Sequence, residues 1–216
     1  MKKIETKKIT AIGMFCALAF IAMVTIKIPV VLFLKYEPKD VIVTMCGLIY
    51  GPAWSLVVSL IVSFVEMITV SDTGFIGFIM NVLSTTSFAC TAAIIYKKGK
   101  SIKAALIGLI LGTVLMTVLM VLWNYLLTPI YMNQPRAAVA SLLLPAFLPF
   151  NLIKGSVNAT LTYLLYRPCI EALRKAGFAA PSKSADKKKT NVPVLVGCSL
   201  VLIVCIILIL VFNGII

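Results

Sequence analysis

The sequence predicts an all-α polytopic membrane protein, with a core of six transmembrane helices and a seventh helix near the C-terminal end. Of its 216 residues, 61% are hydrophobic and only 12% are charged, whereas soluble domains have about 45–50% apolar and about 25% charged residues. A soluble fold of this size would have to expose apolar patches larger than soluble monomers tolerate. The composition therefore indicates that the chain folds in a lipid bilayer.

The expected helices follow from apolar runs, because a helix needs about 20 apolar residues to cross a bilayer. The core runs cover residues 9–31, 41–50, 53–70, 75–96, 104–130 and 141–166. The polar segment 35–40 follows the first run, and the turn signal Gly51-Pro52 ends the short second one. Residues 192–212 contain no charge, which predicts a seventh crossing that acts as a lipid anchor.

These runs divide the chain into four parts. A basic segment (1–8) precedes the six-helix membrane domain (9–170), and a basic linker (171–191) leads to the part that holds the seventh helix (192–216). Fifteen of the 20 basic residues flank apolar runs in three clusters, within 2–8, 97–103 and 167–189. By the positive-inside rule, this predicts a multi-pass plasma membrane protein with a cytoplasmic N-terminus. No DNA-binding motif is present, so we expect no nucleic acid partner.

Polar side chains inside the sixth core run fall on one face. At 100° per residue, Asn151, Lys154, Asn158 and Thr162 lie within about 80° of one another. A lysine within a span costs about 2.5–3.5 kcal/mol at the bilayer centre, which indicates a specific role. The favoured interpretation is a donor that faces a cavity, and the alternative is a lysine that reaches the interface or pairs with Glu66.

Two further core runs carry similar stripes. The fifth has Thr113, Thr117, Asn124 and Thr128 on one face, and the fourth has Asn81, Ser84, Thr85 and Phe88. Together the stripes predict an apolar-walled cavity in the outer half of the bundle, which suits a planar, neutral ligand with a polar edge. Glu66 is the one carboxylate expected within a span, which disfavours a proton or sodium relay.

Small residues at four-residue spacing predict close helix approach. One such pair is Gly13 and Ala17, and the other is Gly108 and Gly112. For the first pair, internal packing and partner docking remain equally open. For the second, internal packing is favoured.

The sequence offers no catalytic machinery. It has no histidine, no cluster of metal ligands and no nucleophile–base pair. The segment Lys97–Ser101 resembles a phosphate loop only superficially, because Ile94 stands where the first glycine is required. We therefore expect no catalytic residue, no bound metal, no cofactor and no ATP hydrolysis.

Several motifs resemble those of a known family, the riboflavin-specific S components of energy-coupling factor (ECF) vitamin transporters. The resemblance covers roughly residues 8–170. The motifs that carry it are Leu34-Lys35-Tyr36-Glu37-Pro38-Lys39-Asp40-Val41, Tyr50-Gly51-Pro52, Trp123-Asn124-Tyr125, Pro129-Ile130-Tyr131 and Leu148-Pro149-Phe150-Asn151-Leu152-Ile153-Lys154-Gly155.

The resemblance implies that riboflavin binds near the outer surface as transported cargo. Asn124, Asn151 and Lys154 would donate or accept hydrogen bonds with the flavin, whose carbonyls and hydroxyls match amide and ammonium groups. Residues from Leu34 to Asp40, among them Lys35 and Tyr36, would form a lid over the ligand. Asn81 is added to the expected site on helical geometry alone.

The resemblance also implies partners, a transmembrane T component and two cytoplasmic ABC ATPases. Gly13 and Ala17 match the family's docking surface, although alanine is usual where Gly13 stands. The seventh helix departs from the family pattern. Two other functions remain open at this point, an S component for another vitamin and a stand-alone facilitator or secondary transporter.

Overall fold

The computed structural model describes residues 6–71, 73–131, 133–178 and 192–215. The elements are α1 (Thr6–Thr25), β1 (Ile28–Val31), β2 (Leu34–Tyr36), α2 (Lys39–Tyr50), α3 (Pro52–Thr69), α4 (Gly74–Gly99), α5 (Ile102–Tyr131), α6 (Arg136–Leu142), the π-helical segment η1 (Leu143–Phe147), α7 (Leu148–Lys175) and α8 (Val192–Phe212). Most of the basic segment 1–8 and of the linker 171–191 lies outside the described residues.

The all-helical membrane fold is confirmed. Within the described residues, six segments are long and apolar enough to cross a membrane, namely α1, α3, α4, α5, the α6–η1–α7 unit and α8. The short second run forms α2, whose 12 residues span about 18 Å at 1.5 Å per residue. This is too short to cross the apolar layer alone, and most of α2 is buried among the other helices.

The first helix ends earlier than predicted. It stops at Thr25, and residues 28–36 form a two-stranded antiparallel hairpin, β1–β2. Pro29 has no backbone N–H to continue a helix and disfavours helical geometry at the preceding residue. The β-branched residues around it favour a strand. The tight turn places Leu32 at a positive φ of 50°.

The sixth predicted helix is interrupted rather than continuous. It consists of α6, the five-residue π-helical segment η1 and the long helix α7. Pro145 lies inside η1 and Pro149 at the start of α7. Because proline cannot donate a backbone hydrogen bond, it breaks the regular ladder at these two positions. The interruption lies one turn before Asn151. Short π-helical segments inside longer helices are frequently found at functional sites.

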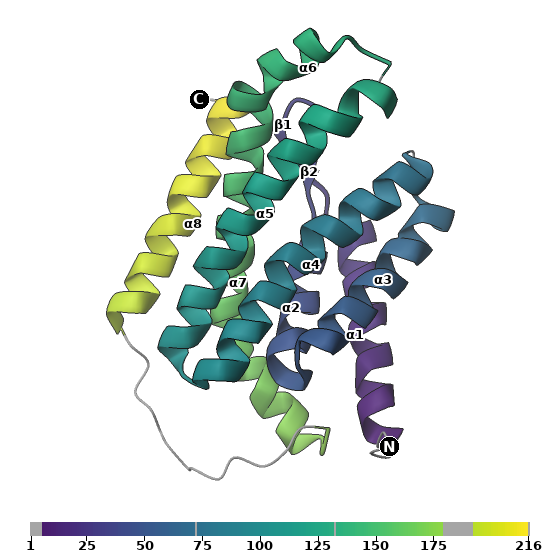
Figure 1. Cartoon of the computed structure of the whole chain (residues 1–216). Helices are drawn as coiled ribbons and strands as arrows, with labels where there is room; N and C mark the ends of the chain where they lie inside the picture. The colour runs from purple at the N-terminus through teal and green to yellow at the C-terminus, as the bar shows by residue number, and fades with distance from the viewer. Residues whose placement is uncertain (1–5, 72, 132, 179–191, 216) are drawn as a thin grey trace.

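The bundle has two chemically different ends (Figure 1). One end, here called the basic end, contains the start of α1, the α4–α5 connection and the end of α7, with lysines such as Lys8, Lys98 and Lys175. The other end, here called the hairpin end, contains β1–β2 and α6. All three predicted basic clusters have described members, and these lie at the basic end.

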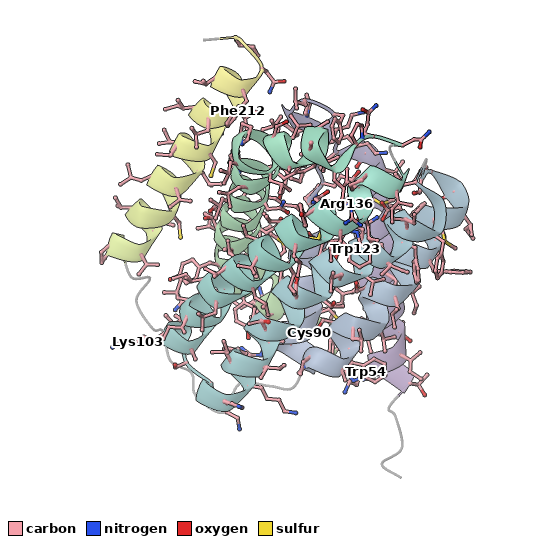
Figure 2. The ribbon with its side chains drawn as sticks, turned by 45° about the horizontal axis from the view of Figure 1, so that its top comes forward. Trp54, Cys90, Lys103, Trp123, Arg136 and Phe212 are labelled. Atoms are coloured by element: carbon pink, nitrogen blue, oxygen red, sulfur yellow. The ribbon has the colours of Figure 1, made fainter. Side chains whose placement is uncertain are left out.

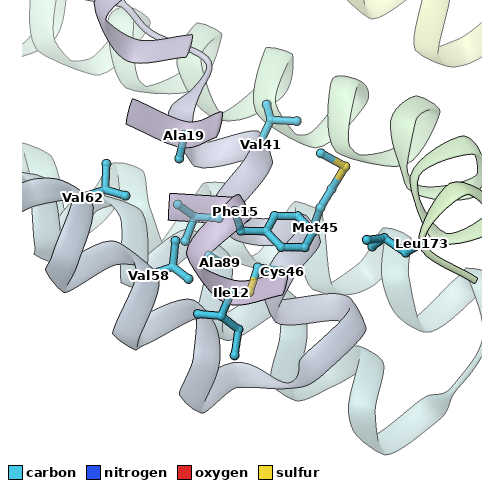
Figure 3. Close-up of a cluster of buried hydrophobic side chains, with 11 residues drawn as sticks. Ile12, Phe15, Ala19, Val41, Met45, Cys46, Val58, Val62, Ala89 and Leu173 are labelled. Carbon is cyan, nitrogen blue, oxygen red and sulfur yellow. The ribbon is translucent and has the colours of Figure 1, made fainter. Parts of the chain in front are cut away.

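The apolar core near the basic end joins five helices (Figure 3). Phe15 of α1 and Val58 of α3 pack around α2, and Leu173 of α7 closes the cluster. A second contact joins α4 to α5 through Gly108 and Gly112. A Cβ added at Gly112 would lie 2.7 Å from the backbone oxygen of Phe88. Internal packing is therefore confirmed for this glycine pair.

Candidate ligand-binding site

Asp40 is the centre of a buried polar network at the hairpin end. It lies in the first turn of α2, where the helix dipole favours a negative charge, and it is fully buried. Its carboxylate accepts hydrogen bonds from Thr85 Oγ1 at 2.6 Å and Asn158 Nδ2 at 3.3 Å. Lys154 Nζ forms an ion pair with it at 3.0 Å. One side chain thus joins α2 to α4 and α7.

The hairpin is tied into the same network by Tyr36. Its hydroxyl donates to Asn158 Oδ1 at 2.9 Å, and both side chains are buried. Asn158 therefore accepts a hydrogen bond from the hairpin and donates one to Asp40. Both the oxygen and the nitrogen of its side-chain amide are used. A movement of the hairpin away from the bundle would break this connection.

A second ion pair lies beside the first. Lys39 Nζ donates to Glu66 of α3, and Asn81 Nδ2 of α4 donates to the other oxygen of the same carboxylate at 2.7 Å. Lys39 is also 3.9 Å from Glu37, which lies between β2 and α2. Burial raises the pKa of the Glu37 carboxyl, and the Lys39 charge opposes that shift. The two ion pairs are neutral together. Two negative charges, on Asp40 and Glu66, are balanced by two positive charges, on Lys39 and Lys154.

The two asparagines expected to bind the ligand are held by local bonds. Asn124 Nδ2 donates to Met120 O at 2.7 Å, and Asn151 Nδ2 donates to Phe147 O at the end of η1, also at 2.7 Å. Both residues are buried. Each amide is therefore held in one orientation by its own helix and takes no part in the bonds around Asp40.

Two of the four buried side-chain polar atoms without a partner among the described residues lie on α5, the helix of Asn124; the other two belong to Ser59 and Thr162. Thr117 Oγ1 and Trp123 Nε1 are buried in the described part of the chain and make no hydrogen bond. Leaving a buried polar group unpaired costs about 1–3 kcal/mol. Unpaired buried donors on α5 are the groups that a polar ligand would satisfy.

The structure brings together some of the predicted site residues and separates others. Tyr36, Asp40 and Lys154 share one network, and Asn81 joins the neighbouring ion pair. Leu34 is half-buried in the apolar cluster under the hairpin, whereas Lys35 is exposed on the hairpin surface.

Two expectations about charge are corrected. Asp40 was expected in the polar segment 35–40 that follows the first apolar run, yet it is fully buried at the start of α2. Lys154 was expected to be a donor that faces a cavity, and the alternative was a lysine that reaches the interface or pairs with Glu66. The pairing with Glu66 is wrong, whereas a role of Lys154 toward a ligand stays a prediction. Its ammonium contacts Asp40 and donates to Ser84 Oγ at 3.3 Å, while Glu66 pairs with Lys39. The sequence carried no sign of which lysine meets which carboxylate.

Sequence reasoning also left three members of the network without a role in the site. Asn158 and Thr85 lie on the predicted stripes, so periodicity could have found them. Lys39 follows Pro38 in a segment that resembles a loop, and no pattern in the sequence indicates that it is only 2% exposed.

A pocket of about 400 Å³ lies elsewhere, between α5, α7 and α8. Its walls are mostly apolar, with Thr113, Thr160 and Tyr163 among the exceptions, and none of the expected ligand-binding residues lines it. We place the candidate site at the hairpin end, because the buried charged side chains Lys39, Asp40 and Glu66 lie there. Among the described residues, no group of three or more histidine, cysteine or acidic side chains could hold a metal.

A helical bundle that is long and apolar enough to span a membrane, with buried polar groups beneath a hairpin, defines a polytopic α-helical membrane protein. The family of ECF transporter substrate-specific components matches residues 7–166. The chain belongs to this family, whose members are transport proteins of the cell membrane and not enzymes.

Similar proteins agree with this assignment. The riboflavin transporter FmnP of Bacillus subtilis (strain 168) is 30% identical over 80% of this chain and 98% of its own length. The riboflavin transporter RibU of Staphylococcus aureus (strain TCH60) is 30% identical over 79% of this chain and 94% of its own length. A solved S component of a bacterial ECF transporter is 31% identical, with a TM-score of 0.66 over 78% of this chain and 98% of the other.

Proposed function

We propose that this chain captures riboflavin outside the cell and delivers it inward together with a T component and two ABC ATPases. Its N-terminus is then cytoplasmic, and the hairpin end faces outward. The similar proteins named as riboflavin transporters support this substrate. The absence of a phosphate loop from the sequence agrees with an external source of energy.

The observation that carries the proposal is the set of buried polar atoms on α5 and α7. Asn124 and Asn151 present fixed amides, and Thr117 and Trp123 offer unpaired donors. Riboflavin has ring carbonyls that accept and ribityl hydroxyls that both donate and accept. Such a ligand would satisfy the unpaired groups.

The network residues have a second role in this proposal. Asp40 and Tyr36 hold the hairpin, with Leu34 and Lys35, over the ligand as a lid. Asp40 also positions the ammonium of Lys154, whose side chain is 12% exposed, and this ammonium contributes one donor to the site. Asn81 acts through Glu66, which it orients by the 2.7 Å bond.

A fluorescence titration of the purified chain with riboflavin tests the substrate. We expect stoichiometric quenching of flavin fluorescence at nanomolar to low-micromolar ligand. A folded sample that leaves the flavin fluorescence unchanged would exclude riboflavin and direct the titration to other vitamins. Uptake in cells that lack the T component and the ATPases would instead identify a stand-alone facilitator.

Docking of the T component on α1 is a separate prediction. Gly13 and Ala17 are exposed, and a Cβ added at Gly13 meets nothing within 4 Å. The Gly13→Leu/Ala17→Leu variant is expected to fold and to bind riboflavin normally, but to lose co-purification with the T component, because small residues permit close helix approach. Gly197→Leu on α8, where an added Cβ is equally free, is the matched control. Unchanged co-purification of the α1 variant would exclude this surface.

A further inference from the structure

The C-terminal helix α8 lies beyond the residues that match the family, 7–166. It stands at the edge of the bundle, against α7 and β1. Most of its large apolar side chains are exposed and point outward (Figure 2). Lipid contact explains those side chains, but it does not explain the polar and buried contacts that α8 makes near its C-terminal end.

The attachment of α8 to the bundle is uneven along its length. Near its start, Val194, Gly197 and Val201 line the pocket that separates α8 from α5. Near its end, Cys205 is only 5% exposed and belongs to the apolar cluster under the hairpin, together with Val30 and Tyr36. The close contact therefore lies at the hairpin end.

Asn213, just after α8, makes the polar part of this contact. Its Nδ2 donates to Pro29 O at 3.2 Å and to Val30 O at 3.5 Å, and also to Ile209 O of its own helix at 2.7 Å. The hairpin register is irregular at this point, since Pro29 and Val31 have cross-strand partners and Val30 has none. A bulge of this kind leaves the extra residue unpaired in the ladder, and Asn213 provides it with a donor.

We propose that α8 holds the β1–β2 hairpin against the bundle, with Asn213 and Cys205 as positioning residues. The hairpin carries Tyr36, which bonds to Asn158 beside Asp40. A restrained hairpin opens less often, and ligand beneath it exchanges more slowly. The consequence for ligand rests on the proposed function, whereas the restraint of the hairpin does not.

Hydrogen exchange of the full chain in lipid nanodiscs, without ligand, tests the restraint. The Asn213→Ala variant is expected to exchange the amides of residues 28–36 about two- to tenfold faster, as loss of one or two hydrogen bonds predicts. The matched control is Ser199→Ala, which removes a side-chain bond within α8 that does not reach the hairpin. Equal hairpin exchange in Asn213→Ala and wild-type protein would overturn the proposal.

Riboflavin dissociation, followed by flavin fluorescence, separates this proposal from the proposed function. If riboflavin binds, its dissociation from Asn213→Ala is expected to accelerate by a similar factor, and an unchanged rate would overturn the effect on ligand exchange. If riboflavin does not bind wild-type protein, the substrate is wrong, and hydrogen exchange still decides whether α8 restrains the hairpin.

Discussion

The Asp40→Ala variant is expected to lose about 3–5 kcal/mol of unfolding free energy, because it leaves a buried partner charge uncompensated. Lys154 would keep only Ser84 as a partner, and Thr85 and Asn158 would lose their acceptor. Unfolding in mixed detergent micelles, followed by tryptophan fluorescence, measures the effect. Stability losses of this size approach the whole stability of a small protein.

A second substitution separates charge from packing. Asp40→Ala/Lys154→Met removes both charges, and we expect it to recover most of the lost stability, since apolar replacement of a buried pair is often tolerated. Glu171→Ala, which removes an exposed carboxylate on α7, should leave stability unchanged. If the double variant is no more stable than Asp40→Ala, the ion pair is not the cause of the loss.

The parts of the site that lie on regular helices follow from the sequence. The stripe on α7 is buried as predicted, with Asn151 at 2%, and Asn158 and Thr162 fully buried. Helical periodicity fixes which residues share a face, and the cost of polar groups in lipid indicates that the face points inward. Both arguments need only local sequence.

The parts of the site that depend on partners distant in the chain do not follow from the sequence. Asp40 lies in a segment with charged neighbours and Pro38, which is typical of a loop. Its burial requires Asn158, which is 118 positions away, and Lys154. The hairpin was missed for a related reason, since residues 26–34 are apolar enough to continue a helix and only Pro29 marks the break. Pairing between distant segments leaves no periodic signal.

The ion pair constrains how a ligand can use Lys154. Its ammonium already contacts Asp40, so it can offer a ligand only its remaining hydrogens. Replacement of Lys154 alone would leave Asp40 unpaired and confuse loss of folding with loss of binding. Asn124 and Asn151 do not have this difficulty, because neither is paired with a charge: Asn124 bonds to Met120 and Thr128 of α5, and Asn151 bonds to Phe147 of η1.

The Asn124→Ala/Asn151→Ala variant is therefore expected to fold and to bind riboflavin about 100-fold more weakly. Each lost hydrogen bond that leaves a ligand group unsatisfied costs about 1–2 kcal/mol, which is about tenfold in affinity. Each single variant should show about a tenfold loss, and flavin fluorescence titration measures all three affinities. The expected loss of about 100-fold is the product of the two single losses, which holds when the two amides contact separate groups of the flavin and do not bond to each other.

Gln134→Ala is the matched control, since it removes an exposed amide at the same end of the bundle. Its affinity for riboflavin should equal that of the wild-type protein. If the double asparagine variant binds as tightly as this control, the amides of α5 and α7 do not contact the flavin. The ligand would then have to lie closer to the paired charges around Asp40 and Glu66, the other buried polar groups at the hairpin end.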